Sequence, residues 1–147
     1  MTDQDTKSMS DGKKTVLVIE DDYFIQDLYQ SFLETAGLNV ICSSDGKNGY
    51  EQAVSKNPNV ILLDIMLPTM NGIEVLKLLK SNLLTKKIPV ILITNLGHQD
   101  IINSALDIGA QGYLLKVRCS PEQLVSTVAI FINHPEYKMD LVTSSNN

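Results

Sequence analysis

The stretch Thr15-Val-Leu-Val-Ile-Glu-Asp-Asp22 combines an uninterrupted apolar run with a short acidic run. An apolar run without alternating polar residues is typical of a strand that is buried on both faces, as in a parallel sheet. Acidic residues directly after such a strand are expected at the edge of the sheet where ligands bind. This stretch therefore predicts a buried strand with a polar site at its carboxyl end.

Four further apolar runs follow, and segments with helical periodicity separate them. The runs cover residues 39–42, 60–63, 89–93 and 112–115. Strands that alternate with helices in this way are typical of an α/β fold, a doubly wound five-stranded parallel sheet with helices on both faces. Because the crossovers are right-handed, the carboxyl ends of all strands are expected at one edge of the sheet.

Local signals mark the ends of the helices. Asp22 directly precedes the first helix, so a helix-capping role is favoured for it over metal binding. Asn71-Gly-Ile-Glu74 has the residues of a capping box, and Gly37 and Gly109 stand where the first and fourth helices should end. Four apolar residues that recur at helical spacing are expected to form the buried face of the first helix: Phe24, Leu28, Phe32 and Leu33.

The patterned region covers residues 15–133 and is predicted to be one domain. Residues 1–14 are rich in Asp, Ser, Lys and Thr and are expected to form a flexible N-terminal arm, and residues 134–147 a C-terminal tail. The apolar runs are far shorter than a membrane span, and the N-terminus has no secretory signal. We therefore expect a cytoplasmic protein without membrane contact.

The chain is acidic, with 12 Lys and Arg against 17 Asp and Glu and a formal net charge of −5. Hydrophobic residues make up 44% and charged residues 20%, which is a normal balance for a globular domain. Proteins that bind nucleic acid directly usually present a basic face to the phosphates. The composition therefore argues against direct contact with nucleic acid.

Polar side chains follow the first, third, fourth and fifth predicted strands: Glu20 and Asp21, Asp64, Thr94, and Lys116. Carboxylates that crowd in one cleft repel each other, and Mg²⁺, which prefers oxygen ligands, relieves that repulsion. A carboxylate beside Mg²⁺ can attack a phosphoryl group and form an aspartyl phosphate. The metal and Lys116 would neutralise the transferring oxygens, and the Thr94 hydroxyl could hydrogen-bond the product.

The chain resembles the receiver domain of two-component response regulators over roughly residues 15–133. The segments that carry the resemblance are Val-Ile-Glu20-Asp21-Asp22, Leu-Leu-Asp64-Ile-Met-Leu-Pro68, Asn71-Gly72, Ile-Thr94 and Gly-Tyr113-Leu-Leu-Lys116. The resemblance implies a flavodoxin-like fold with strand order 2-1-3-4-5. It also implies phosphoryl transfer, dependent on Mg²⁺, from a sensor histidine kinase or a histidine phosphotransfer protein, followed by a change in the surface that an effector protein or effector domain binds.

The same resemblance implies how the metal and the phosphoryl group are held. Asp64 would be the phosphoacceptor, and Asp21 a direct Mg²⁺ ligand. Glu20 would act on the metal directly or through water. The backbone carbonyl of Met66 would complete the protein's share of the metal shell.

Three further residues would connect phosphorylation to the surface. Thr94 would be the switch hydroxyl, Lys116 the partner of the phosphate, and Tyr113 the switch aromatic, although Tyr also suits a strand without any such role. The docking surface is predicted around these residues: Ile101, Ile102, Ala105, Tyr113 and Val117. The chain would catalyse only its own phosphorylation and dephosphorylation, since a haloacid-dehalogenase-type phosphatase needs an Asp where Met66 stands.

Two residues depart from the family pattern. Val117 follows Lys116 where the family usually has a Pro joined by a cis peptide bond, and we expect a trans bond, because a cis bond without Pro costs roughly 2.5–4 kcal/mol. Asn95 follows Thr94 where a small residue is usual. These departures motivate a second hypothesis, a phosphorylation-independent, receiver-like protein-interaction module.

Overall fold

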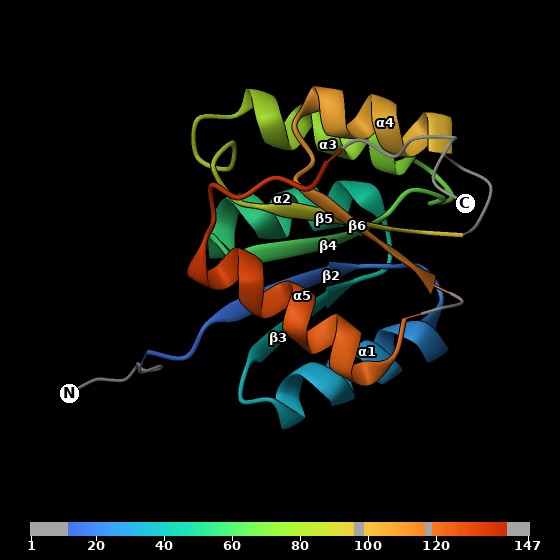
Figure 1. The fold of residues 1–147 in the computed structure, drawn as a ribbon. Helices are drawn as coiled ribbons and strands as arrows, with labels where there is room; N and C mark the ends of the chain where they lie inside the picture. Colours follow the sequence, from blue (N-terminus) through green and yellow to red (C-terminus); the bar gives the residue numbers. More distant parts are fainter. Residues whose placement is uncertain (1–11, 96–98, 117–118, 141–147) are drawn as a thin grey trace.

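The computed structural model describes residues 12–95, 99–116 and 119–140, which form a five-stranded sheet with helices on both faces (Figure 1). The strands are β2 (Thr15–Ile19), β3 (Asn39–Ser43), β4 (Val60–Asp64), β5 (Val90–Thr94) and β6 (Gly112–Leu115). They lie in the order β3-β2-β4-β5-β6, and all neighbours are parallel. Counted along the chain, this is the predicted order 2-1-3-4-5, so the predicted fold class is confirmed.

The helices divide between the two faces of the sheet. They are α1 (Tyr23–Thr35), α2 (Gly46–Lys56), α3 (Gly72–Ser81), α4 (Gln99–Ile108) and α5 (Pro121–Asn133). Helices α1 and α5 cover one face, and α2, α3 and α4 cover the other (Figure 1). Both faces of the central strands β4 and β5 are buried, which explains their unbroken apolar runs. Among the helices that the structure describes, none has the length and apolar character needed to cross a membrane.

The predicted helix ends agree with the structure. The Asp22 carboxylate accepts hydrogen bonds from the amides of Phe24 (2.9 Å) and Ile25 (3.3 Å), so Asp22 caps α1. Asn71 and Glu74 form a reciprocal capping box at the start of α3. Gly37 follows α1 with a φ of +90°, a left-handed conformation that favours glycine.

The predicted buried face of α1 is partly wrong. Phe24 is 72% exposed and Leu28 is 36% exposed, whereas Gln26, Tyr29 and Leu33 are buried. The cause is a polar contact, because Gln26 Nε2 donates to the Glu20 carbonyl at 2.7 Å and so draws this face of α1 toward the end of β2. A buried Gln whose amide is satisfied cannot be recognised from apolar periodicity.

The predicted docking surface is also partly wrong. Ile102 and Ala105 are almost completely buried between α4 and the sheet, where they belong to the core on that face. They point inward because α4 is amphipathic and covers the sheet with this side. Ile101 and Tyr113 are half-buried, and Val117 lies outside the described residues.

Candidate functional site

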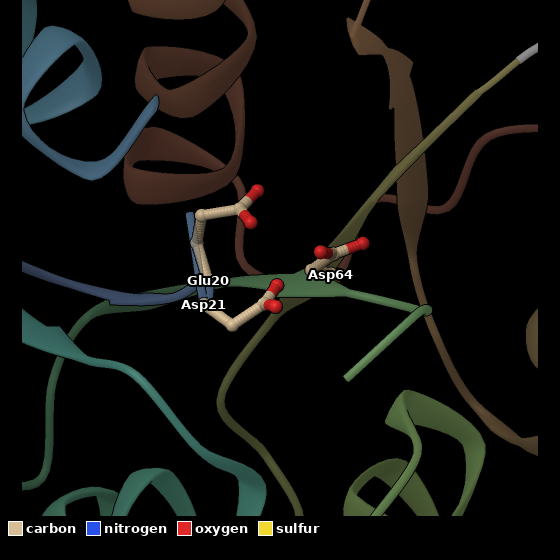
Figure 2. A group of neighbouring side chains, drawn as sticks. All are labelled: Glu20, Asp21 and Asp64. Atoms are coloured by element: carbon tan, nitrogen blue, oxygen red, sulfur yellow. The ribbon is translucent and has the colours of Figure 1, made fainter. Parts of the chain in front are cut away.

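The central strands β2 and β4 bring three carboxylates together at the carboxyl edge of the sheet. The two strands pair in parallel with Ile19 opposite Leu63, so the residues that follow them emerge side by side. Figure 2 shows Glu20 and Asp21 at the end of β2 and Asp64 at the end of β4. One carboxylate oxygen from each residue lies within 4.8 Å of the others. The structure thus assembles the acidic side chains that the sequence selected.

Lys116 extends into this cluster from the residue after β6. Its Nζ atom lies 3.0 Å from Asp64 Oδ2, to which it donates a hydrogen bond, and 2.9 Å from Glu20 Oε1. Glu20 and Asp64 are 0% and 2% exposed, whereas the Lys116 side chain is 18% exposed. The ammonium group of Lys116 therefore faces two buried carboxylates, and the exposed Asp21 contributes a third carboxylate to the cluster.

Glu20 has an oxygen that fits a cation. Its Oε2 atom accepts a hydrogen bond from the Asp22 amide at 3.0 Å. Its buried Oε1 atom forms an ion pair with Lys116 Nζ at 2.9 Å and has no further hydrogen-bond partner among the described residues. A buried carboxylate oxygen of this kind, next to two more carboxylates, matches the all-oxygen coordination that Mg²⁺ prefers. The donor set thus fits the predicted metal.

Burial changes the protonation of this cluster. Burial raises the pKa of Glu20 to about 7, and the neighbouring charge of Asp64 adds to the shift, while the Asp22 amide and Lys116 oppose it. For Lys116, burial alone would lower the pKa, but its contacts with Glu20 and Asp64 raise it overall. Lys116 is therefore charged at neutral pH, and the metal-free site takes up a proton on Glu20 near pH 7.

The raised pKa of Glu20 makes the stability of the metal-free protein depend on pH. Between pH 4.5 and about 7 the folded protein keeps a proton that the unfolded chain releases, so this group stabilises the fold at low pH and the contribution is lost as pH rises to about 7. The variant Glu20→Gln has an amide at this position, which does not take up or release a proton in this pH range. In urea unfolding with a chelator, we expect the wild type to lose more stability than Glu20→Gln between about pH 5 and pH 8. Parallel pH profiles would contradict this assignment.

The backbone around Asp64 fixes the position of its carboxylate. Asp64 Oδ1 accepts a hydrogen bond from the Met66 amide at 3.1 Å. Gly72, the first residue of α3, donates its amide to the Ile65 carbonyl at 2.8 Å. A Cβ atom at position 72 would collide with the Asp64 carbonyl oxygen and lie 2.6 Å from Ile65 Cα. Only glycine therefore allows α3 to begin directly against the loop that carries Asp64.

The other predicted site residues lie around the same edge. Thr94 is the last residue of β5 and is buried, and its hydroxyl donates to the Asn95 carbonyl at 3.4 Å. The Met66 side chain, two residues after Asp64, is 59% exposed. Tyr113 lies in the middle of β6, three residues before Lys116. The predicted trans bond between Lys116 and Val117 falls outside the described residues.

Sequence reasoning missed one residue that supports the site. Gln26, a residue of α1, donates a side-chain hydrogen bond to the Glu20 carbonyl. The Glu20 amide donates to the Ser43 carbonyl at 3.0 Å. These two bonds fix the backbone of Glu20 from both sides. Nothing in the sequence distinguishes Gln26 from an exposed helical Gln, apart from its place one turn after the helix cap.

Comparisons with known proteins agree with this geometry. A family model described as the response regulator receiver domain matches residues 16–129. The transcriptional regulatory protein CrdR of Helicobacter pylori is 36% identical over 104 residues, which cover 71% of this chain and 48% of CrdR. The DNA-binding dual master transcriptional regulator RpaA of Synechocystis is 42% identical over 102 residues, which cover 69% of this chain and 42% of RpaA. The chain therefore spans about half the length of the curated relatives it matches.

Solved structures have the same fold. The chemotaxis protein CheY4 of Vibrio cholerae superposes with a TM-score of 0.76 at 26% identity, over 80% of this chain and 98% of CheY4. The receiver domain of the Francisella response regulator 1452 gives a TM-score of 0.75 at 29% identity, over 82% of this chain and 98% of that domain. The likeness thus covers almost the whole of each known domain.

Proposed function

The chain belongs to the family of response regulator receiver domains, and from this premise we propose that Asp64 accepts a phosphoryl group in a site that binds Mg²⁺. One observation carries the proposal: the buried carboxylate of Asp64 lies 3.0 Å from the ammonium of Lys116 and within reach of the carboxylates of Glu20 and Asp21. This geometry supports the proposal, because the proposed nucleophile, a cation and the proposed metal-binding oxygens would then act within one small site.

Glu20, Asp21, Asp64 and the backbone carbonyl of Met66 would hold the metal. When bound, Mg²⁺ would supply positive charge that balances the oxygens of the phosphoryl group during transfer. No other role is needed from it, because Asp64 is the nucleophile and Lys116 already supplies a second positive charge beside Asp64.

The transfer itself forms one bond and breaks one bond. A carboxylate oxygen of Asp64 attacks phosphorus, and the bond from phosphorus to the imidazole nitrogen of the donor phosphohistidine breaks, with its electron pair left on that nitrogen. The Met66 amide orients Asp64 through Oδ1, and the ammonium of Lys116 then pairs with the phosphoryl oxygens. The Thr94 hydroxyl donates to the same oxygens once the group is in place.

Phosphorylation would then change a protein-binding surface. Thr94 ends β5, and Lys116 directly follows β6, so both groups that would contact the phosphoryl group lie at the carboxyl ends of the last two strands. We infer that the donor is a histidine kinase or a phosphotransfer protein and that an effector protein or domain reads the change. RpaA is named as DNA-binding, but for this acidic chain the absence of direct nucleic-acid contact stays a prediction.

The dependence on Mg²⁺ tests the proposal. The protein is incubated with acetyl phosphate and Mg²⁺, or with acetyl phosphate and a chelator, and its intact mass is measured. We expect a species heavier by one phosphoryl group with Mg²⁺ and almost none with the chelator. An unmodified mass at saturating Mg²⁺ would contradict the proposal and favour the phosphorylation-independent interaction module.

A further inference from the structure

The segment that follows α5 turns back and crosses the beginning of β6. Figure 1 shows this segment in red, running from the end of α5 toward the region between β6 and α4. We call residues 135–140 the strap. Strand β6 is the last strand of the sheet and pairs only with β5 among the described strands, so its other edge is open to a further segment.

The strap binds this open edge through Met139. The Met139 amide donates to the Gln111 carbonyl at 2.8 Å, and the Met139 sulfur accepts from the Tyr113 amide at 3.4 Å. The side chain of Gln111 donates to the carbonyls of Pro135 and Tyr137. The Tyr113 amide of β6 and the Gln111 carbonyl directly before this strand are thus paired within the chain.

The packing around Met139 is close and specific. A Cβ atom at Gly112 would lie 2.7 Å from the Met139 sulfur, so glycine at this position leaves the room that the side chain occupies. Met139 packs against the core between the sheet, α1 and α5, and the ring of Tyr137 lies 5.6 Å from that of Phe131. The strap is therefore seated in a defined position.

The strap is nevertheless held by few contacts. Met139 is half-buried, but the other residues of the strap are exposed. A segment with one partly buried side chain and exposed backbone bonds opens at much lower free energy than a core strand.

Resting on the function proposed above, we propose that the strap is a self-inhibitory cover of β6, which lifts when Asp64 is phosphorylated. Strand β6 connects the strap with the phosphorylation site. Tyr113 binds the strap through its amide, and Lys116, directly after the same four-residue strand, binds Asp64. When Lys116 follows the phosphoryl group, β6 moves with it and the Gln111–Met139 contact opens. The freed edge is then available to the effector.

Hydrogen exchange tests the release. The phosphoryl mimic beryllofluoride is added with Mg²⁺, and ¹⁹F NMR reports whether the adduct forms. In the wild type we expect amides of residues 135–140 and of Tyr113 to exchange at least about fivefold faster in the adduct than in the free protein. An adduct without faster exchange in the strap would overturn the inference and leave the proposed function standing. Without an adduct on the wild type, the proposed function fails instead.

The affinity for beryllofluoride supplies a second, independent measurement, because strap release and adduct formation are thermodynamically linked. If phosphorylation releases the strap, then loss of the strap must strengthen adduct formation by the same factor. Met139→Asp places a charge in the apolar seat, and we expect fast exchange of the strap without any adduct and about three- to tenfold tighter beryllofluoride binding. Met139→Leu keeps the apolar volume and should behave like the wild type.

A chain that ends at His134 gives a control that does not depend on a substitution. It should reproduce the tighter binding of Met139→Asp. Equal beryllofluoride affinity in the wild type, Met139→Asp and the shortened chain would overturn the inference, because reciprocity allows no release without such a change.

Discussion

Asp64→Asn is expected to abolish phosphorylation. The amide has nearly the shape of the carboxylate but is not a nucleophile, so the Met66 contact can be kept while the reacting oxygen is lost. With acetyl phosphate and Mg²⁺, we expect the rate of adduct formation to fall by more than about 100-fold. Intact mass spectrometry over a time course measures this rate.

Asp22→Asn is the matched control for Asp64→Asn. Asp22 is acidic and lies close to the site, but its carboxylate caps α1, and Asn caps a helix about equally well. We expect this variant to form the adduct at nearly the rate of the wild type. Equal modification of Asp64→Asn and the wild type would mean that the phosphoryl group enters elsewhere.

Lys116→Met is expected to have the largest effect on stability. The substitution leaves Glu20 and Asp64 buried and facing each other without a positive charge. Removal of one partner from a buried ion pair is strongly destabilising, and we expect a loss of roughly 2–3 kcal/mol in the free energy of unfolding at about pH 8. The loss should shrink near pH 6, where Glu20 takes up a proton at little cost. Urea unfolding with a chelator measures both values.

Two further measurements test whether the charge of Lys116, and not the volume of its side chain, stabilises the fold. Lys116→Arg keeps the charge and should recover most of the stability. Addition of Mg²⁺ to Lys116→Met should also restore part of it, since another cation then faces the carboxylates. If Lys116→Met is as stable as the wild type at both pH values, Lys116 does not balance the buried carboxylates.

Most of the fold could be predicted from the sequence because apolar runs and segments with helical periodicity follow each other along the whole domain. The apolar runs of β4 and β5 are buried on both faces, and parallel strands of this kind occur almost only in α/β folds. Once the strands are parallel, the positions of Asp64 and Lys116 follow from the chain alone. The sequence could thus select residues that are far apart in the chain but adjacent in the site.

The remaining features depend on contacts that leave no periodic signal. Gln26 is buried because its amide finds the Glu20 carbonyl, and this turns Phe24 and Leu28 outward. Met139 lies in a short segment of mixed polar and apolar residues without periodicity, and the space at Gly112 lets it pack on β6. Such features follow from the assembled sheet, so apolar periodicity could not reveal them.

The most direct test of phosphorylation at Asp64 is to trap the modified residue chemically. After reaction with acetyl phosphate and Mg²⁺, borohydride reduces an aspartyl phosphate to homoserine, and peptide sequencing by mass spectrometry locates it. We expect homoserine at position 64 and unmodified Asp21 and Asp22. Homoserine at Asp21 or Asp22, or its absence from a protein that carries the phosphoryl group, would contradict the assignment of Asp64.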